Sequence, residues 1–257
     1  MSEALFPEGA TIVFGGSGGI GQAVVRSFAE AGSDVAIVYR SKADVAARVA
    51  DDAVKLGRKA TIHAADITAP GDVQKVIDDA IAAHGRLHTI VWGAGPLVDQ
   101  VLLTDTSFDQ WRRAIEIEVN GFFAVMKAAL PHLRATGGGS FVTLGSAGHA
   151  RWPDRDGLSV APKASNESLV RGIAREEGRH GIRANSVLVG VIEAGMFLEL
   201  TRQGVFDQQW VDEVQKSLAL KRWGQPEEIG HAAVFLASNR AAYVTGQQIN
   251  VSGGYGL

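Results

Sequence analysis

Residues 10–21, Ala-Thr-Ile-Val-Phe-Gly-Gly-Ser-Gly-Gly-Ile-Gly, decide the fold of this chain. A short apolar strand over residues 10–14 ends in a cluster of glycines, and apolar residues at helical spacing begin at Ile20. Glycines between a strand and a helix permit a tight turn, and they let backbone N–H groups approach a pyrophosphate at the positive end of the helix. The stretch therefore predicts a dinucleotide-binding turn. The residues assigned to this turn are Gly15, Ser17, Gly19, Ile20 and Gly21.

The rest of the chain continues the alternation of strands and helices. Strict alternation implies parallel strands joined by right-handed crossovers, and continuous apolar strands imply that helices cover both faces of the sheet. No Pro/Ser-rich linker divides residues 1–257, so we expect one α/β domain, a doubly wound Rossmann-type fold with a seven-stranded, mostly parallel sheet. Residues 191–220 are expected to form a helical cap over the substrate. Further strands are predicted over 35–39, 60–64, 89–92, 140–144, 183–189 and 248–251, and helices over 19–32, 43–56, 70–84, 107–134, 158–179 and 226–237.

Composition excludes several classes of protein. Charged residues make up 21% of the 257 residues and hydrophobic ones 46%, which is ordinary for a packed globule. The net charge is −3 with no basic block, so we expect no nucleic-acid partner. The absence of cysteine excludes disulfides and thiolate metal sites. No apolar run reaches the roughly 18 residues of a membrane span, and residues 1–10 lack a signal-peptide pattern, so a cytoplasmic protein without membrane contact is expected.

The glycine turn also contains G-x-S-x-G, the nucleophile-elbow pattern of hydrolases. That elbow normally follows several strands of its sheet, whereas Ser17 follows the first strand. The flanking strand, the flanking helix and the N-terminal position are what a dinucleotide site requires. The pattern therefore favours nucleotide binding over hydrolysis.

Residues about 20 positions beyond the turn set the cofactor preference in this kind of fold. An Asp or Glu at the end of the second strand would bind the ribose hydroxyls of NAD, but this chain has Tyr39-Arg40-Ser41-Lys42. Arg40 and Ser41 suit a 2′-phosphate, because a guanidinium offers bidentate, charge-assisted hydrogen bonds. The alternative is a solvated start to the next helix. The sequence favours NADP(H), with NAD(H) as the alternative cofactor.

From residue 14 to residue 254 the chain resembles the short-chain dehydrogenase/reductase superfamily. Residues 14–21 resemble its T-G-x-x-x-G-x-G, residues 93–95 its N-A-G, and residues 222–254 its C-terminal signature. The resemblance implies hydride exchange between a nicotinamide and a carbonyl or alcohol. It gives the catalytic positions to Ser146, Lys163, the relay asparagine Asn120, and Ser159 in the place of the family's tyrosine. It gives further cofactor contacts to Asp66, which faces adenine, and to Ile67, Gly93, Ala94, Gly95, Lys163, Gly190 and Ile192.

The resemblance fails at the proton donor. In the family a serine hydrogen-bonds the substrate oxygen, a tyrosine phenol gives or takes the proton, and a lysine lowers the phenol pKa from about 10 toward neutrality. Four residues before Lys163 the chain has Ser159, whose hydroxyl is shorter and far less acidic than a phenol. The tyrosines of the chain, Tyr39, Tyr243 and Tyr255, lie in other segments. Ser159 therefore cannot do the tyrosine's work unaided.

Other departures gather in the nicotinamide half of the site. Gly93 replaces the asparagine of N-A-G, Val189 replaces the proline after the sixth strand, and Ala194 replaces the threonine that contacts the carboxamide. Pro162 lies in the predicted catalytic helix, where it is tolerable only near the start. The phosphate-binding half of the family pattern is thus better kept than the nicotinamide half.

Three functions remain open at this point. The first is an active reductase whose proton comes from His149, or from a water held by Ser159, Lys163 and Asn120. A substrate with an acidic product, such as a quinone, would need less help. The second is a catalytically silent partner of an active homologue in a mixed oligomer. The third is another reaction in the same cleft, such as dehydration.

The remaining features concern the substrate, the oligomeric state and the possibility of a metal site. Apolar residues of the cap predict a small, largely apolar carbonyl or alcohol substrate, although a helical hairpin burying its own core explains them equally well. The resemblance implies a homodimer or homotetramer in which the helices 107–134 and 158–179 meet their copies and the last strand aids a tetramer. His84 and His88 have metal-like spacing, but a predicted turn separates them, so no metal site is expected. The charged loop Asp154-Arg155-Asp156 is interpreted as solvated.

Overall fold

Within residues 4–257, which the computed structural model describes, seven strands form one sheet in the order β3-β2-β1-β4-β5-β6-β7. Every neighbouring pair of strands is parallel. This confirms the doubly wound α/β fold, and the sheet is parallel throughout rather than mostly parallel. Residues 1–3, the start of the segment that lacks a signal-peptide pattern, lie outside the described part. The strands are β1 (Ala10–Phe14), β2 (Asp34–Tyr39), β3 (Ala60–Ala64), β4 (Leu87–Trp92), β5 (Gly139–Ser146), β6 (Ile182–Val189) and β7 (Gln248–Val251).

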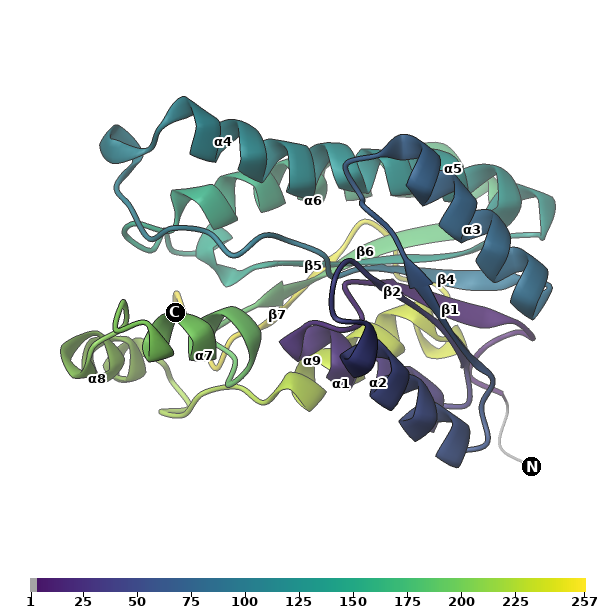
Figure 1. The fold of residues 1–257 in the computed structure, drawn as a ribbon, viewed down its shortest axis with the longest axis horizontal. Coiled ribbons are helices and arrows are strands. Elements are labelled where there is room, and N and C mark those ends of the chain that lie inside the picture. Colours follow the sequence, from purple (N-terminus) through teal and green to yellow (C-terminus); the bar gives the residue numbers. More distant parts are fainter. Residues whose placement is uncertain (1–3) are drawn as a thin grey trace.

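Helices cover both faces of the sheet, as the apolar strands predicted. Figure 1 shows α1 (Gly19–Glu30), α2 (Ala43–Lys55) and α9 (Pro226–Ala237) on one face. The other face carries α3 (Pro70–His84), α4 (Phe108–Ile115), α5 (Gly121–Ala135) and α6 (Gly157–Glu177). Among the described residues, no helix is both long and apolar enough to cross a membrane.

The predicted helix over 107–134 is interrupted. A capping box between Ser107 and Gln110 starts α4, and a π-turn over Glu116–Asn120 separates α4 from α5. A π-turn adds one residue to the helical repeat, so residues after it face directions that an uninterrupted helix would not give them. The π-turn carries both Glu118 and Asn120.

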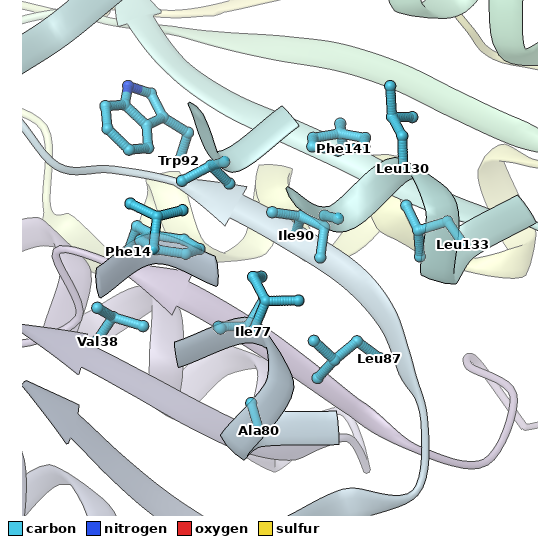
Figure 2. Packing of buried hydrophobic residues seen from close by; sticks show 14 of the residues in the cluster. Phe14, Val38, Ile77, Ala80, Leu87, Ile90, Trp92, Leu130, Leu133 and Phe141 are labelled. Atoms are coloured by element: carbon cyan, nitrogen blue, oxygen red, sulfur yellow. The ribbon is translucent and has the colours of Figure 1, made fainter. Parts of the chain in front are cut away.

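Aliphatic side chains and a few aromatic ones fill the core under α3 and α5 (Figure 2). Trp92 at the end of β4 packs between Phe14 of β1 and Phe122 of α5, with ring centroids 6.0 and 5.7 Å away. All five residues of β1 and all six of β4 are buried, because the central strands have helices on both faces. The ends of these two rigid strands carry the glycine turn and residues 93–95.

The segment predicted as a cap forms two short helices, α7 (Gly195–Arg202) and α8 (Gln208–Ser217). Met196 at the start of α7 packs against Val98 and Leu158, so this end of the segment closes over the carboxyl edge of the sheet. The aromatic residues of the segment pack against one another instead. Phe206 stacks on Trp210 with ring centroids 3.8 Å apart. The segment therefore buries an aromatic core of its own, which is the alternative to a substrate cap that the sequence left open.

One buried histidine predicts acid sensitivity of the fold. His88 is 2% exposed, hydrogen-bonds Ser33 and Thr89, and stacks on Phe6. Burial lowers the pKa of His88 from 6.5 to about 4. The unfolded chain takes up this proton at a higher pH than the folded one, so stability present above pH 6.5 is lost as the pH falls toward 4. We expect this residue to lower the free energy of unfolding by about 2.5 kcal/mol between pH 7 and 4.5.

Urea denaturation of wild type and His88→Gln at the two pH values measures this loss. The variant is less stable at pH 7 but loses less stability on acidification. Equal losses in both proteins would show that other groups, among them His63, His84 and His132, whose pKa values burial also lowers, dominate the acid response.

Candidate active site

The glycine turn between β1 and α1 has room for backbone only. A Cβ at Gly21 would lie 2.1 Å from the carbonyl oxygen of Gly15, and one at Gly15, where φ is +81°, would lie 2.6 Å from the carbonyl oxygen of Gly93. Gly18 caps α1 without a side-chain hydrogen bond, so side chains leave the first N–H groups of the helix open to an anion. Gly19 touches the backbone of Gly195. This geometry fits a pyrophosphate and brings the turn against the start of α7.

The end of β2 presents a cation beside the site predicted for adenine. Arg40, Ser41 and Lys42 are all exposed, and within residues 4–257 no hydrogen bond holds the Arg40 guanidinium. Asp66 after β3 accepts hydrogen bonds from the backbone and hydroxyl of Thr68, which lower the pKa of its carboxyl, and the charge of Arg40 lowers it further. Arg40 and Asp66 therefore lie on the same edge of the sheet, as two cofactor-binding residues should.

Lys163 of α6 is bound to a carboxylate that sequence reasoning missed. Its Nζ donates to Glu118 Oε2 at 2.8 Å, and the side chains of Lys163 and Glu118 are only 19% and 3% exposed. Glu118 Oε1 accepts from Trp92 Nε1 at 3.3 Å and lies 3.4 Å from Asn166 Nδ2, which also donates to the backbone oxygen of Glu118. A Cβ at Gly95 would lie 2.8 Å from Glu118 Oε2. The pair thus lies directly against the loop after β4.

The structure does not bring Asn120 into this site. Asn120 is exposed and donates to Glu116, one turn away on the outer side of the helix. Glu118, two residues earlier in the same π-turn, is buried and contacts Lys163 instead. Residues two positions apart face opposite sides of a helix, so only one of Glu118 and Asn120 can face Lys163.

Ser146 and Ser159 lie on facing elements. Ser146 ends β5, and its Oγ accepts from the N–H of Gly148, so the hydroxyl hydrogen is left to donate elsewhere. Gly148 packs tightly on Val160, which follows Ser159 in the first turn of α6. Pro162 is the sixth residue of α6, near the start as its geometry requires. Ser146 therefore lies at the carboxyl end of β5, and Ser159 and Lys163 lie in the first turns of the neighbouring helix α6.

Asp156 is the second titratable residue that the sequence analysis undervalued. It is only partly exposed, and burial raises the pKa of its carboxyl, against the opposing influence of Gln100 and Lys163. Asp156 precedes α6 at the N-cap but makes no capping hydrogen bond, and its Oδ1 accepts from Gln100 Nε2 at 3.1 Å instead. The preceding Arg155 has φ +66°, a strained conformation for a residue with a side chain. The expectation of a solvated loop therefore fails at Asp156.

Two other candidate proton donors are placed less favourably. His149 Nε2 lies 3.3 Å from the carbonyl oxygen of Val160 and therefore donates to the backbone of α6. Tyr255 comes near the cleft from the C-terminal tail, over Arg151, but burial and the charges of Asp156 and Asp154 raise the pKa of its phenol. A raised pKa makes this phenol a poorer acid at neutral pH. Neither residue reproduces the missing tyrosine.

The other residues predicted to contact the cofactor lie just after the carboxyl ends of the strands. The N–H of Gly93 donates to the carbonyl oxygen of Phe14, and the N–H of Gly190 donates to that of Val251. A Cβ at Gly190 would lie 2.6 Å from Ser252. Ile192 is buried and pairs with Gly224, and Ile67 packs on the core beside Gly121, so both have structural contacts. Ala94 packs on the same core. These residues line the edge on which a nucleotide would lie.

No cluster of three or more His, Asp or Glu side chains within residues 4–257 is arranged to hold a metal ion. His84 and His88 do not face each other. His84 hydrogen-bonds Thr61, whereas His88 points into the core toward Ser33.

Known proteins share this fold and sequence pattern. Residues 15–256 match the family model described as "Enoyl-(Acyl carrier protein) reductase". L-fucose dehydrogenase of Rattus norvegicus is 32% identical over 243 residues, covering 95% of this chain and 87% of that protein. Cyclohexanol dehydrogenase of Acinetobacter sp. (strain SE19) is 32% identical over 251 residues, covering 97% and 96%. The structure of 7α-hydroxysteroid dehydrogenase complexed with NADH and 7-oxo glycochenodeoxycholic acid has a TM-score of 0.90 at 30% identity, covering 99% and 97%.

The parallel sheet with a glycine turn at the end of its first strand defines a Rossmann-type protein. With these relatives, the chain belongs to the short-chain dehydrogenase/reductase superfamily of oxidoreductases.

Proposed function

We propose that this protein is an NAD(P)-dependent oxidoreductase that interconverts a small alcohol and its carbonyl compound and prefers NADP(H). The observation that carries the proposal is the carboxyl edge of the sheet. This edge holds the N-terminus of α1, which no side chain caps, the Asp66 carboxylate and the exposed Arg40 guanidinium, for which residues 4–257 contain no hydrogen-bond partner. The relatives named above are dehydrogenases of a sugar, an alcohol and a steroid. Their range supports the reaction class and leaves the substrate to be found by screening.

The residues present fit a dinucleotide. The first turn of α1 would hold the pyrophosphate, Asp66 the adenine, Arg40 and Ser41 a 2′-phosphate, and Lys163 the ribose next to the nicotinamide. When bound, the cofactor supplies or accepts the hydride. The rest of the chemistry is the work of side chains in the cleft.

We assign the proton transfer to Asp156. Ser159 and Lys163 lie four residues apart on one face of α6, and Asp156 precedes Ser159 by three residues at the N-cap of the helix. Ser159 is much shorter than a tyrosine, so a second group is needed to carry the proton beside Ser146. In alcohol oxidation the Asp156 carboxylate takes the hydroxyl proton while Ser146 donates a hydrogen bond to the substrate oxygen; in reduction the protonated carboxyl returns it. Burial raises the pKa of Asp156 and so favours the exchange nearer neutral pH.

Lys163 does not serve as a base for Ser159. A serine–lysine nucleophile needs an amine free to take the serine proton, and Lys163 Nζ instead donates to Glu118 at 2.8 Å. This argues against hydrolysis in the same cleft. A silent subunit or a dehydrating activity has no observation of its own in its favour.

The outer face of α4, α5 and α6 supports a dimer. It exposes Phe108, Trp111 and Phe123, and it contains two hollows of about 540 and 460 Å³, the second lined by Phe123, Ser165 and Leu169. These are the helices through which the family resemblance implies contact between two copies. We therefore propose a homo-oligomer built on this face. Sedimentation of wild type and Phe123→Asp tests it, because a charge at an apolar interface opposes association.

The preference for NADP(H) predicts the effect of Arg40→Ala. Removing a charge-assisted contact to the 2′-phosphate is expected to weaken NADPH binding about 10- to 100-fold and NADH binding less than threefold. Calorimetry and nicotinamide fluorescence measure both constants. Arg58→Ala is the matched control, because Arg58 binds the carbonyl oxygen of Gly32 before the opposite end of β2.

Equal losses for both nucleotides in Arg40→Ala contradict the NADP(H) preference but not the reaction class. Wild-type protein that binds neither nucleotide contradicts the proposed function itself, and a search for a partner protein would then take its place.

A further inference from the structure

Glu118 changes the charge of the nicotinamide half of the site. The resemblance leads one to expect a neutral asparagine beside the active-site lysine, which would leave that region with one positive charge. Here the Glu118 carboxylate lies 2.8 Å from Lys163 Nζ, and the pair carries no net charge. The difference is one full negative charge, buried where solvent screens it weakly.

The contacts of Glu118 place the carboxylate between the buried core and the loop after β4. Three nitrogen groups converge on it, from Lys163, Trp92 and Asn166. Gly95, in the loop assigned to the cofactor, has space for no side chain, since a Cβ there would lie 2.8 Å from Glu118 Oε2 and 3.7 Å from Lys163 Nζ. The glycine lets the ion pair lie directly beneath the loop that would contact a nucleotide.

We propose that Glu118 biases the site toward the oxidised form of the cofactor. An oxidised nicotinamide ring carries a positive charge and a reduced ring carries none. A cleft that has lost one positive charge therefore binds the oxidised form more tightly, relative to the reduced form, than a cleft with an unpaired lysine. The inference rests on the proposed function and adds to it a preference for alcohol oxidation. The enzyme would be occupied mainly by the oxidised cofactor, which is the form that accepts hydride from an alcohol. The overall equilibrium of the reaction is unchanged, because only the occupancy of the protein is affected.

The test is the ratio of the dissociation constants of NADP⁺ and NADPH, measured by calorimetry without substrate. In Glu118→Gln the ratio Kd(NADP⁺)/Kd(NADPH) is expected to rise about tenfold, the size expected for a unit charge acting within a protein site. Glu118→Asn, which restores a neutral amide beside Lys163, is a second variant expected to move the ratio the same way. Glu118→Asp keeps the charge and keeps the ratio low.

Glu116→Gln is the matched control, because Glu116 is exposed on the same π-turn and contacts Asn120 rather than Lys163. Its ratio is expected to equal that of wild type. Weakening of both cofactor forms by the same factor in folded Glu118→Gln and Glu118→Asn would overturn the inference and leave Glu118 with a structural role. Failure of the wild type to bind either form would overturn the proposed function as well, so the two failures are distinguishable.

Discussion

Ser159→Tyr is expected to raise the reduction of generic ketones and quinones about tenfold, because it returns a phenol to a position four residues before Lys163. The gain is limited by Glu118. In the family the lysine charge lowers the phenol pKa, but here Lys163 shares its charge with a carboxylate 2.8 Å away. Ser159→Tyr combined with Glu118→Asn is therefore expected to gain about 100-fold over wild type, within the range of general acid catalysis. Initial rates of NADPH oxidation measure both variants.

Ser159→Phe separates the effect of the phenol hydroxyl from the effect of the aromatic ring. It fills the same space without a hydroxyl, so it is expected to show no gain. A double variant that folds, binds NADPH and still shows no gain would mean that the nicotinamide pocket itself is not competent, and it would favour a silent or non-redox protein.

Asp156→Asn is expected to lower kcat/KM for alcohol oxidation about 100-fold while leaving cofactor affinity within a factor of two, since the amide cannot accept the proton. The wild-type rate rises with pH as the carboxyl, whose pKa lies above 3.8, loses its proton, and the variant lacks this rise. Ionisation of a group whose pKa is raised by folding costs stability at neutral pH. The variant should therefore be no less stable than wild type at pH 7, and a purely structural role for Asp156 predicts the opposite.

Two control substitutions test whether the effect is specific to Asp156 and whether the Tyr255 phenol transfers the proton instead. Asp154→Asn alters an exposed carboxylate two residues earlier and is expected to leave the rate unchanged. Tyr255→Phe removes the phenol that lies over Arg151 and is also expected to be neutral. A large loss in Tyr255→Phe together with a normal Asp156→Asn would transfer the proton step to the C-terminal tail. In the Ser159→Tyr background Asp156→Asn should cost little, because the phenol then carries the proton.

The fold was predictable from sequence because its signals are local and repeated. Each buried strand is a short apolar run followed by glycine or a polar residue, and the glycine turn at residues 15–21 fixes the start of the alternation. The positions of Ser146 and Lys163 followed from counting within the family pattern. These features depend on neighbours along the chain, which a single sequence displays.

The site was less predictable where the backbone departs from regular geometry. Glu118 rather than Asn120 contacts Lys163, and both residues lie in a π-turn that no residue type between 107 and 134 announces. Asp156 was read as solvated because its neighbours are charged, yet Gln100, from a distant loop, and the start of α6 half-bury it. In both cases the deciding contact joins segments far apart in sequence, so composition and spacing carry no signal for it.

The single extra residue in the π-turn divides one continuous helix into two halves that face different neighbours. The first half, α4, packs toward α6 and the cleft, whereas the second half, α5, packs toward α3 and the core. Because the two halves contact different helices, α4 joins this segment to α6 and α5 joins it to α3. A substitution in α4 therefore disturbs a different interface from a substitution in α5.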